Sequence, residues 1–114
     1  MHHTVSLCEN NRFRGLYARG KTAAAPTIAV YTRKNKLKTT SRLGITTSVK
    51  LGCAVERNKA RRRIRECYRT HEQLLQPGYD IVIVARARVL TKPYQALEGD
   101  MMALFQKLGL LKKI

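Results

Sequence analysis

Residues 54–75 read AVERNKARRRIRECYRTHEQLL, a stretch with seven basic and three acidic side chains. At about 100° per residue, it forms a helix with an apolar arc on one side and a basic face on the other. The predicted core arc comprises Ala60, Ile64, Cys67, Tyr68, His71, Leu74 and Leu75. The opposite face carries Asn58, Arg62, Arg65 and Arg69. Three acids cannot neutralise the seven basic side chains of this helix, and arginine binds phosphate oxygens through paired donors, so the pattern favours a nucleic-acid contact over a merely solvated surface.

Four short segments on either side of this helix have the patterns of strands. They are residues 21–24, 27–34, 42–49 and 79–89. In the second segment, Ile28 and Val30 point to one face and Tyr31 to the other. The last segment begins apolar on both faces, which predicts a central strand covered on both sides. It ends with Arg86 and Arg88, which are expected to face the same way.

Two further helices are expected, one toward each end of the chain. The first begins near Asn10 or Asn11, either of which can cap it, and ends by Gly20. The second begins near Pro93 and ends at Gly109. Its apolar positions are Leu97, Met101, Leu104, Phe105 and Leu108. Residues 33–41 are polar and basic and predict a loop between two strands.

The charge of the whole chain is strongly unbalanced. Its 114 residues carry 23 Lys and Arg against seven Asp and Glu, a net charge of +16. Residues 12–65 hold 16 of the basic side chains and one acid. Such an excess opposes compaction and calls for a polyanionic partner, with nucleic acid the first candidate. The length fits a single domain over residues 1–114, and neither a membrane span nor a secretory signal is visible, so a cytoplasmic location is expected.

The sequence offers little for catalysis by the protein itself. The three cysteines, Cys8, Cys53 and Cys67, are odd in number and widely spaced, which fits reduced thiols and neither a disulfide framework nor a zinc site. No nucleophile motif, phosphate-binding loop or paired-carboxylate pattern is present. We therefore expect no catalytic residue and no metal ligand in this chain.

Residues 42–66, RLGITTSVKLGCAVERNKARRRIRE, resemble the signature of the bacterial ribonuclease P protein component. The family pattern is roughly RLGIxVSKKxGxAVxRNxxKRxxRE, and its central part is called the RNR motif. The resemblance combines a strand, a glycine turn and the arginine helix in the same order. It extends to residues 11–20, 28–31 and 79–86, and so covers nearly the whole chain.

This resemblance implies an α+β fold, a two-layer α–β sandwich like a ribosomal-protein domain, with a four-stranded sheet and three helices. It also implies a left-handed βαβ crossover, against the general preference for the right hand. In the family the protein assists a catalytic RNA that removes the 5′ leader from precursor tRNA. The implied partners are ribonuclease P RNA and precursor tRNA, with no membrane and no protein partner. The implied cofactor is Mg²⁺, bound mainly by the RNA.

The resemblance also implies particular binding residues. The residues expected to bind RNA are Lys50, Arg57, Asn58, Lys59, Arg61, Arg62 and Arg65, with Arg69 from the same helix face. The residues expected in the leader cleft are Phe13, Tyr17, Tyr31 and Arg33. By spacing alone, ordinary core packing is the favoured interpretation of Phe13 and Tyr17, and the resemblance is what points to the cleft. Two positions depart from the family pattern: Val49 replaces the first lysine of the turn, and Ala60 replaces a larger aliphatic residue.

Two other functions fit parts of the sequence. A ribosomal or other structural RNA-binding protein would carry a similar charge and fold. A protein that binds a membrane surface or an acidic partner would also be basic, but it would not need arginine in place of lysine, and the apolar side of the helix is required for the core.

Overall fold

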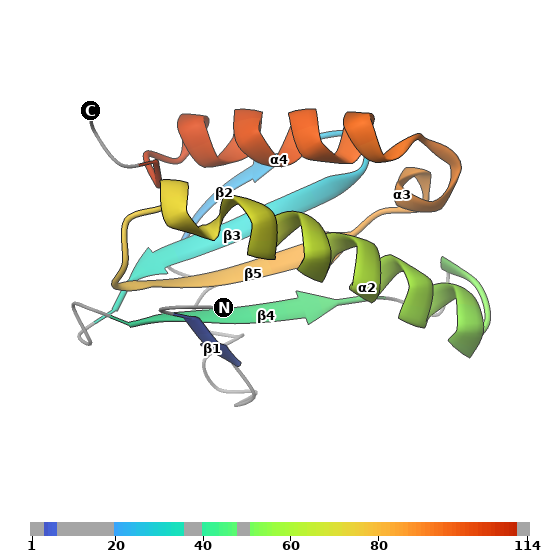
Figure 1. Ribbon diagram of the computed structural model, residues 1–114, viewed down its shortest axis with the longest axis horizontal. Coiled ribbons are helices and arrows are strands. Elements are labelled where there is room, and N and C mark those ends of the chain that lie inside the picture. The colour runs from blue at the N-terminus through green and yellow to red at the C-terminus, as the bar shows by residue number, and fades with distance from the viewer. Residues whose placement is uncertain (1–3, 7–19, 36–39, 48–50, 112–114) are drawn as a thin grey trace.

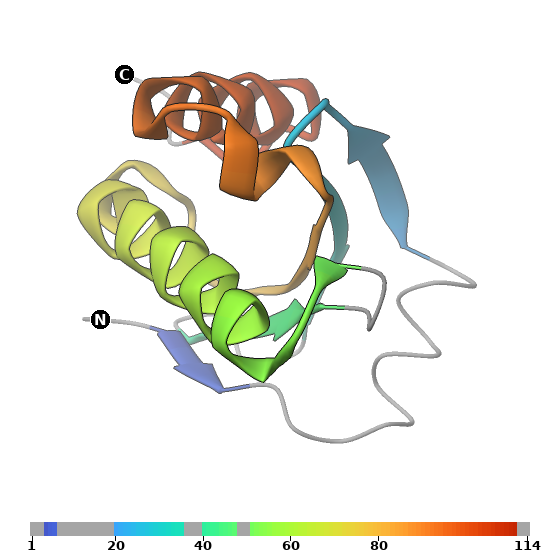
Figure 2. The same cartoon turned by 90° about the vertical axis from the view of Figure 1, so that its right-hand side faces the viewer.

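The computed structural model describes residues 4–6, 20–35, 40–47 and 51–111. Its strands form one sheet in the order β1-β4-β5-β3-β2. The strands are β1 Thr4–Ser6, β2 Lys21–Ala24, β3 Ile28–Lys34, β4 Ser41–Thr46 and β5 Tyr79–Ala85. The helices are α2 Ala54–His71, the 3-10 turn η2 Glu72–Leu74, α3 Arg88–Thr91 and α4 Tyr94–Lys107. Helices α2 and α4 lie on one side of the sheet, which makes the predicted two-layer sandwich (Figures 1 and 2).

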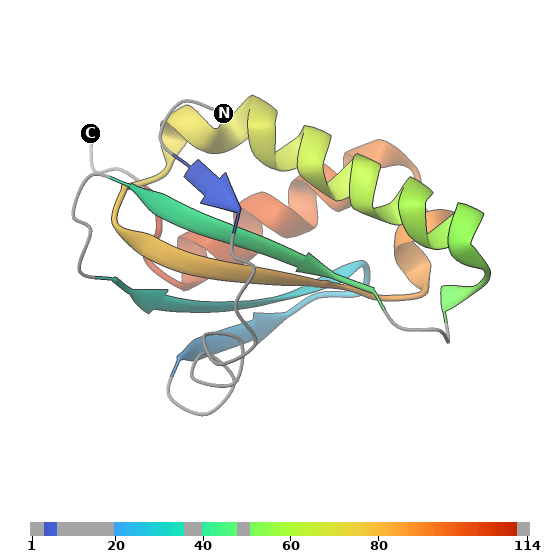
Figure 3. The ribbon, with the colours of Figure 1, turned by 90° about the horizontal axis from the view of Figure 1, so that it is seen from below.

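The four predicted strands are confirmed, and they form the mixed sheet that the resemblance implied. Strand β1 was not predicted, because three residues are too short to show a periodic pattern. It pairs in parallel with β4 at the edge of the sheet, as Figure 3 shows. The expected N-terminal helix, from Asn10 or Asn11 to Gly20, falls almost wholly outside the described residues.

The connection from β4 through α2 to β5 has the hand that the resemblance implied. The two strands are parallel neighbours. In Figure 1 both run from left to right, β5 lies above β4, and α2 passes in front of the sheet on its way back. When the view is turned so that both strands point up and α2 stays in front of the sheet, β5 lies to the left of β4. A crossover that moves to the left in this view is left-handed. The general preference for right-handed crossovers would have predicted the opposite arrangement.

Strand β5 is central, as predicted, and its interior is covered on both faces. It pairs with β3 on one side and β4 on the other, and Ile81, Val82 and Ile83 are all buried. The strand ends at Ala85, four residues earlier than predicted. Its partner β3 begins at Ile28, directly opposite Ala85, so β3 has no residue with which a longer β5 could pair. Arg88 therefore does not share a strand face with Arg86 but begins α3.

The core arc of α2 is largely as predicted. Ala60, Ile64, Cys67 and Tyr68 are fully buried, and the Tyr68 ring meets Phe105 of α4 edge to face. Burial raises the pKa of the Cys67 thiol to about 11, so this thiol is a neutral core group.

The prediction was wrong at Leu74, which is 50% exposed, while Leu75 is 1% exposed. The α-helix ends at His71 and tightens into η2, so the 3.6-residue period no longer applies there. His71 is half-buried, and its Nδ1 lies 2.7 Å from the carbonyl oxygen of Cys67.

Helix α4 follows its predicted pattern closely. It begins directly after Pro93, and Gly109 ends it with a positive φ of 73°. Its four buried residues are Leu97, Met101, Leu104 and Phe105, whereas the predicted Leu108 is only partly buried. Asp100 ties this helix to the start of β3, because its Oδ2 accepts hydrogen bonds from the backbone N–H and the hydroxyl of Thr27.

The two adjacent leucines at the end of α2 give a matched test of the core. Leu75→Ala should lower the free energy of unfolding by about 2–5 kcal/mol, because it opens a cavity among buried side chains. Leu74→Ala should change it by less than about 0.5 kcal/mol. Urea unfolding of the two variants measures both values. Equal losses would show that Leu74 is also part of the core.

Candidate nucleic-acid interface

The outward side of α2 carries a continuous row of exposed side chains. We call this row the α2 stripe, and it comprises Val55, Asn58, Arg62, Arg65 and Arg69. The four polar members are exposed, as the periodicity predicted. Val55 is 73% exposed, which is unusual for a valine and places an apolar contact at the start of a basic row. The stripe thus presents charge, amide donors and one apolar side chain together.

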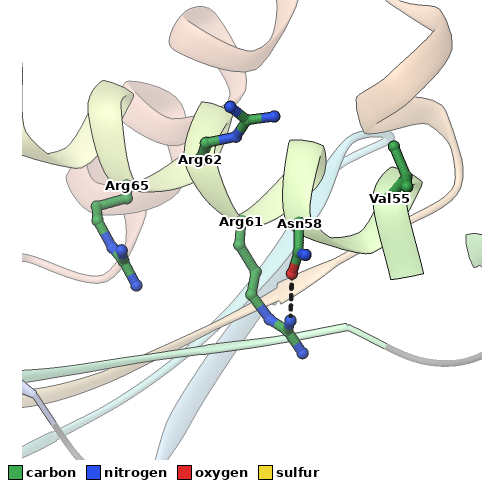
Figure 4. Close-up of a pocket in the computed structure, with 5 residues that line it drawn as sticks. All are labelled: Val55, Asn58, Arg61, Arg62 and Arg65. Carbon is green, nitrogen blue, oxygen red and sulfur yellow. Dashed lines mark hydrogen bonds between the residues drawn. The ribbon is translucent and has the colours of Figure 1, made fainter.

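The N-terminal half of the stripe borders a shallow hollow of about 450 Å³. Figure 4 shows Arg61 and Arg65 pointing toward the β4 side of the helix and Arg62 pointing away from it. Arg61 Nη1 donates a hydrogen bond of 3.1 Å to Asn58 Oδ1. This contact holds the arginine in place and uses the carbonyl of the amide. The NH₂ group of Asn58 is then left to donate to a ligand, which suits a phosphate or base acceptor.

Among the residues that the structure describes, carboxylates balance the positive charge of the stripe at one position. Arg69 forms an exposed ion pair with Glu66, which lowers the pKa of that carboxyl. Within the described residues, Arg62 and Arg65 form no hydrogen bond or ion pair with any side chain. Other carboxylates are engaged away from the stripe: Asp80 binds Arg42 through two hydrogen bonds of 2.6 and 2.8 Å, and Asp100 binds Thr27. The charges of Arg62 and Arg65 are therefore available to a polyanion.

Arg63 belongs to the same arginine run but has a different role. Its Nη1 donates to the carbonyl oxygens of Val89 and Lys92, at 3.1 and 3.3 Å. These contacts join α2 to α3 and orient the helix against the rest of the fold. The spacing of about 100° per residue places Arg63 away from the outward stripe. The structure adds the identity of the carbonyl groups that it binds.

Strand β3 brings Tyr31 and Arg33 to the sheet face opposite the helices. Tyr31 is paired in register with Val82, and both form a small apolar cluster with Val84, separate from the main core. Arg33 is exposed two residues further along the same face. An aromatic ring beside an exposed cation matches the requirements for holding single-stranded nucleic acid.

The other expected binding residues fall into two groups. Arg57 is half-exposed in the first turn of α2, and Lys59 is exposed on the same helix. Phe13, Tyr17 and Lys50 lie outside the described residues.

Sequence reasoning missed the basic residues that follow β5. Arg86 and Arg88 line a hollow with Ala24, Ala25 and Pro26. Arg86 Nη1 donates to the carbonyl oxygen of Ala25 at 3.1 Å. Helix α3 lies at the end of the molecule where α2 begins (Figure 1), so these arginines extend the positive surface there. The Arg-Ala-Arg spacing predicts the end of a strand, whereas the structure places Arg88 at the start of α3.

A family model described as Ribonuclease P matches residues 1–109. The chain belongs to the ribonuclease P protein family. Family members are protein subunits of ribonuclease P, an endoribonuclease ribonucleoprotein, and this chain is such a subunit, involved in the 5′ processing of precursor tRNA. The resemblance stated from the sequence is thus confirmed.

Individual relatives support the same assignment. The chain is 37% identical over 101 residues to the ribonuclease P protein component of Symbiobacterium thermophilum, which covers 89% of this chain and 88% of that protein. It is 38% identical over 104 residues to that of Clostridium acetobutylicum, with 90% and 87% covered. The fold matches the Staphylococcus aureus RNase P protein with a TM-score of 0.83 at 30% identity, covering 94% and 97%. The Thermotoga maritima protein gives 0.80 at 27% identity, covering 90% and 96%. No helix in the described part of this ribonuclease P protein is long and apolar enough to cross a membrane.

Arg63 and Arg62 give a matched test of the two roles within the arginine run. Arg63→Ala should lower the free energy of unfolding by about 1–2 kcal/mol, because two carbonyls lose their donor. Arg62→Ala should leave it unchanged within about 0.5 kcal/mol, because its side chain is exposed. Chemical denaturation of both variants provides the comparison. A loss at Arg62 as large as that at Arg63 would contradict the assignment.

Proposed function

We propose that the α2 stripe, together with Arg57, Lys59 and Arg61, binds the RNA component of ribonuclease P. The observation that carries this proposal is the pair Arg62 and Arg65, exposed and without an acid partner among the described residues. Phosphate oxygens accept paired N–H donors from arginine, and each neutralised phosphate releases counterions. Lys50, next to the start of α2 in the sequence, completes this set by its match to the family pattern.

The leader of precursor tRNA binds on the other side of the sheet in this proposal. Tyr31 supplies an aromatic surface on which a base stacks, and Arg33 supplies a cation for the backbone. Base stacking on an aromatic side chain contributes about 1–3 kcal/mol per base and tolerates any sequence. Phe13 and Tyr17 belong to the same cleft by the family resemblance. The protein thereby holds the catalytic RNA with one face and the substrate with the other.

Mg²⁺ is assigned to the RNA component in this proposal. Magnesium prefers oxygen ligands such as carboxylates. Among the described residues, no group of three or more His, Cys, Asp or Glu side chains is placed to hold a metal ion. Asp80 and Asp100 are already bound to Arg42 and Thr27. In this proposal the protein contributes positive charge and substrate contacts.

The stripe is tested by the double substitution Arg62→Ala plus Arg65→Ala. Affinity for ribonuclease P RNA should fall at least about tenfold at moderate salt, because two phosphates lose their partners. The slope of log affinity against log salt should decrease by about 1.4–1.8. Filter binding over a range of salt concentrations measures both quantities. The control is Lys107→Ala, an exposed cation on α4; a loss of the same size in this control would contradict a specific stripe.

The leader cleft is tested in the reconstituted holoenzyme at low magnesium. Tyr31→Ala should reduce the preference for precursor over mature tRNA by about fivefold to a hundredfold, because one stacked base is lost. Tyr31→Phe keeps the ring and should retain most of the preference. Competition binding of precursor and mature tRNA measures it. An unchanged preference in Tyr31→Ala would remove this residue from the cleft, and no stimulation of the RNA by the unaltered chain would refute the proposed function itself.

A further inference from the structure

Val55 is an exposed apolar side chain in the first turn of α2. It is 73% exposed, and in the part of the chain that the structure describes Leu74, at 50%, is the other large apolar side chain that is exposed. A single exposed valine needs no explanation on a protein surface. Val55, however, lies in line with Asn58 and Arg62, three and seven residues further along the same helix face. It is therefore the apolar member of a row whose other members are polar or charged.

The hollow on the stripe brings this valine together with a donor and several cations. Its volume is about 450 Å³, within the range of small-ligand sites. It is lined by Val55, Asn58, Arg61, Arg62 and Arg65, and none of these residues is acidic. All five belong to α2, so the helix fixes their relative positions. In Figure 4, Arg61 and Arg65 point to one side of the helix and Arg62 to the other, so cations flank the hollow on both sides.

Asn58 supplies a directed hydrogen-bond donor beside Val55. Arg61 Nη1 donates to Asn58 Oδ1 at 3.1 Å. A guanidinium has donors and no acceptor, so this contact determines which end of the amide carries the oxygen and leaves the NH₂ group for a ligand. Residues three apart on a helix are neighbours, so Asn58 and Val55 can contact one ligand group together. A phosphate has acceptors but no apolar face, whereas a nucleobase has both.

We propose that this hollow takes one unpaired nucleobase of the RNA component, with the face of the base against Val55. The edge of the base accepts a hydrogen bond from Asn58, and the neighbouring phosphates lie on Arg62 and Arg65. This inference rests on the proposed function, because the RNA is the one that the stripe binds. A paired base in an RNA helix is stacked between its neighbours, so only an unpaired nucleotide can present its face to the protein. Val55 therefore makes the stripe prefer an RNA with an unpaired nucleotide at this place over a plain duplex.

The experiment measures binding of whole ribonuclease P RNA to the full chain over a range of salt concentrations. Val55→Thr keeps the branched shape but replaces a methyl group by a hydroxyl, and affinity should fall about fivefold. The slope of log affinity against log salt should stay the same, because no phosphate contact is lost. Val55→Ile keeps the apolar contact and should bind within about twofold of the unaltered chain. Leu74→Thr is the matched control, because it changes the other exposed apolar side chain and should leave affinity unchanged.

A fully paired RNA duplex is the second probe. Val55→Thr should bind the duplex as tightly as the unaltered chain does, because a duplex presents no free base face. An equal loss on both RNAs, no loss on ribonuclease P RNA, or a smaller salt slope in Val55→Thr would overturn the inference.

Failure of the proposed function gives a different pattern. In that case the double variant Arg62→Ala plus Arg65→Ala would bind ribonuclease P RNA normally. Failure of this inference alone would leave the double variant weak and Val55→Thr normal.

Discussion

The orientation of α2 is the constraint on which the rest of the structure depends. The helix buries four residues, Ala60, Ile64, Cys67 and Tyr68. Burial of these positions determines which side of the helix faces solvent. Packing of the core therefore directs Arg62 and Arg65 outward, with no hydrogen bond or ion pair from the described part of the chain to hold them. Arg63 adds the second constraint, because its bonds to the carbonyls of Val89 and Lys92 fix the helix against α3.

The distribution of carboxylates complements this arrangement. Asp80 and Asp100 bind partners within the fold, and both of these contacts lie away from the outward side of α2. Among the described residues, Glu66 is the one carboxylate that pairs with the stripe, where it binds Arg69 at the C-terminal half of the helix. The N-terminal half therefore has the higher density of unbalanced charge. An RNA surface that follows the helix would meet its strongest attraction near Asn58 and Arg62, where Arg57 and Arg61 also lie.

Much of the fold was predictable because its signals are periodic. The four core strands, the arc and stripe of α2, and the buried face of α4 all follow from spacing. The failures occur where periodicity ends: Leu74 lies in a tightened turn, and Arg88 lies beyond the last paired residue of β5. The role of Arg63 was also beyond prediction, since its partners are carbonyl groups 26 and 29 residues away.

The left-handed connection between β4 and β5 has a consequence for the whole surface. With the same strand order, a right-handed connection would carry α2 across the opposite side of the sheet. The helix would then cover β4 and β5 on the face that carries Tyr31 and Arg33, and its apolar arc would pack against Val82 beside Tyr31. The unusual hand keeps the two proposed RNA-binding surfaces on separate sides of the sheet. The hand of one connection thus gives this chain of 114 residues two separate surfaces for its proposed partners.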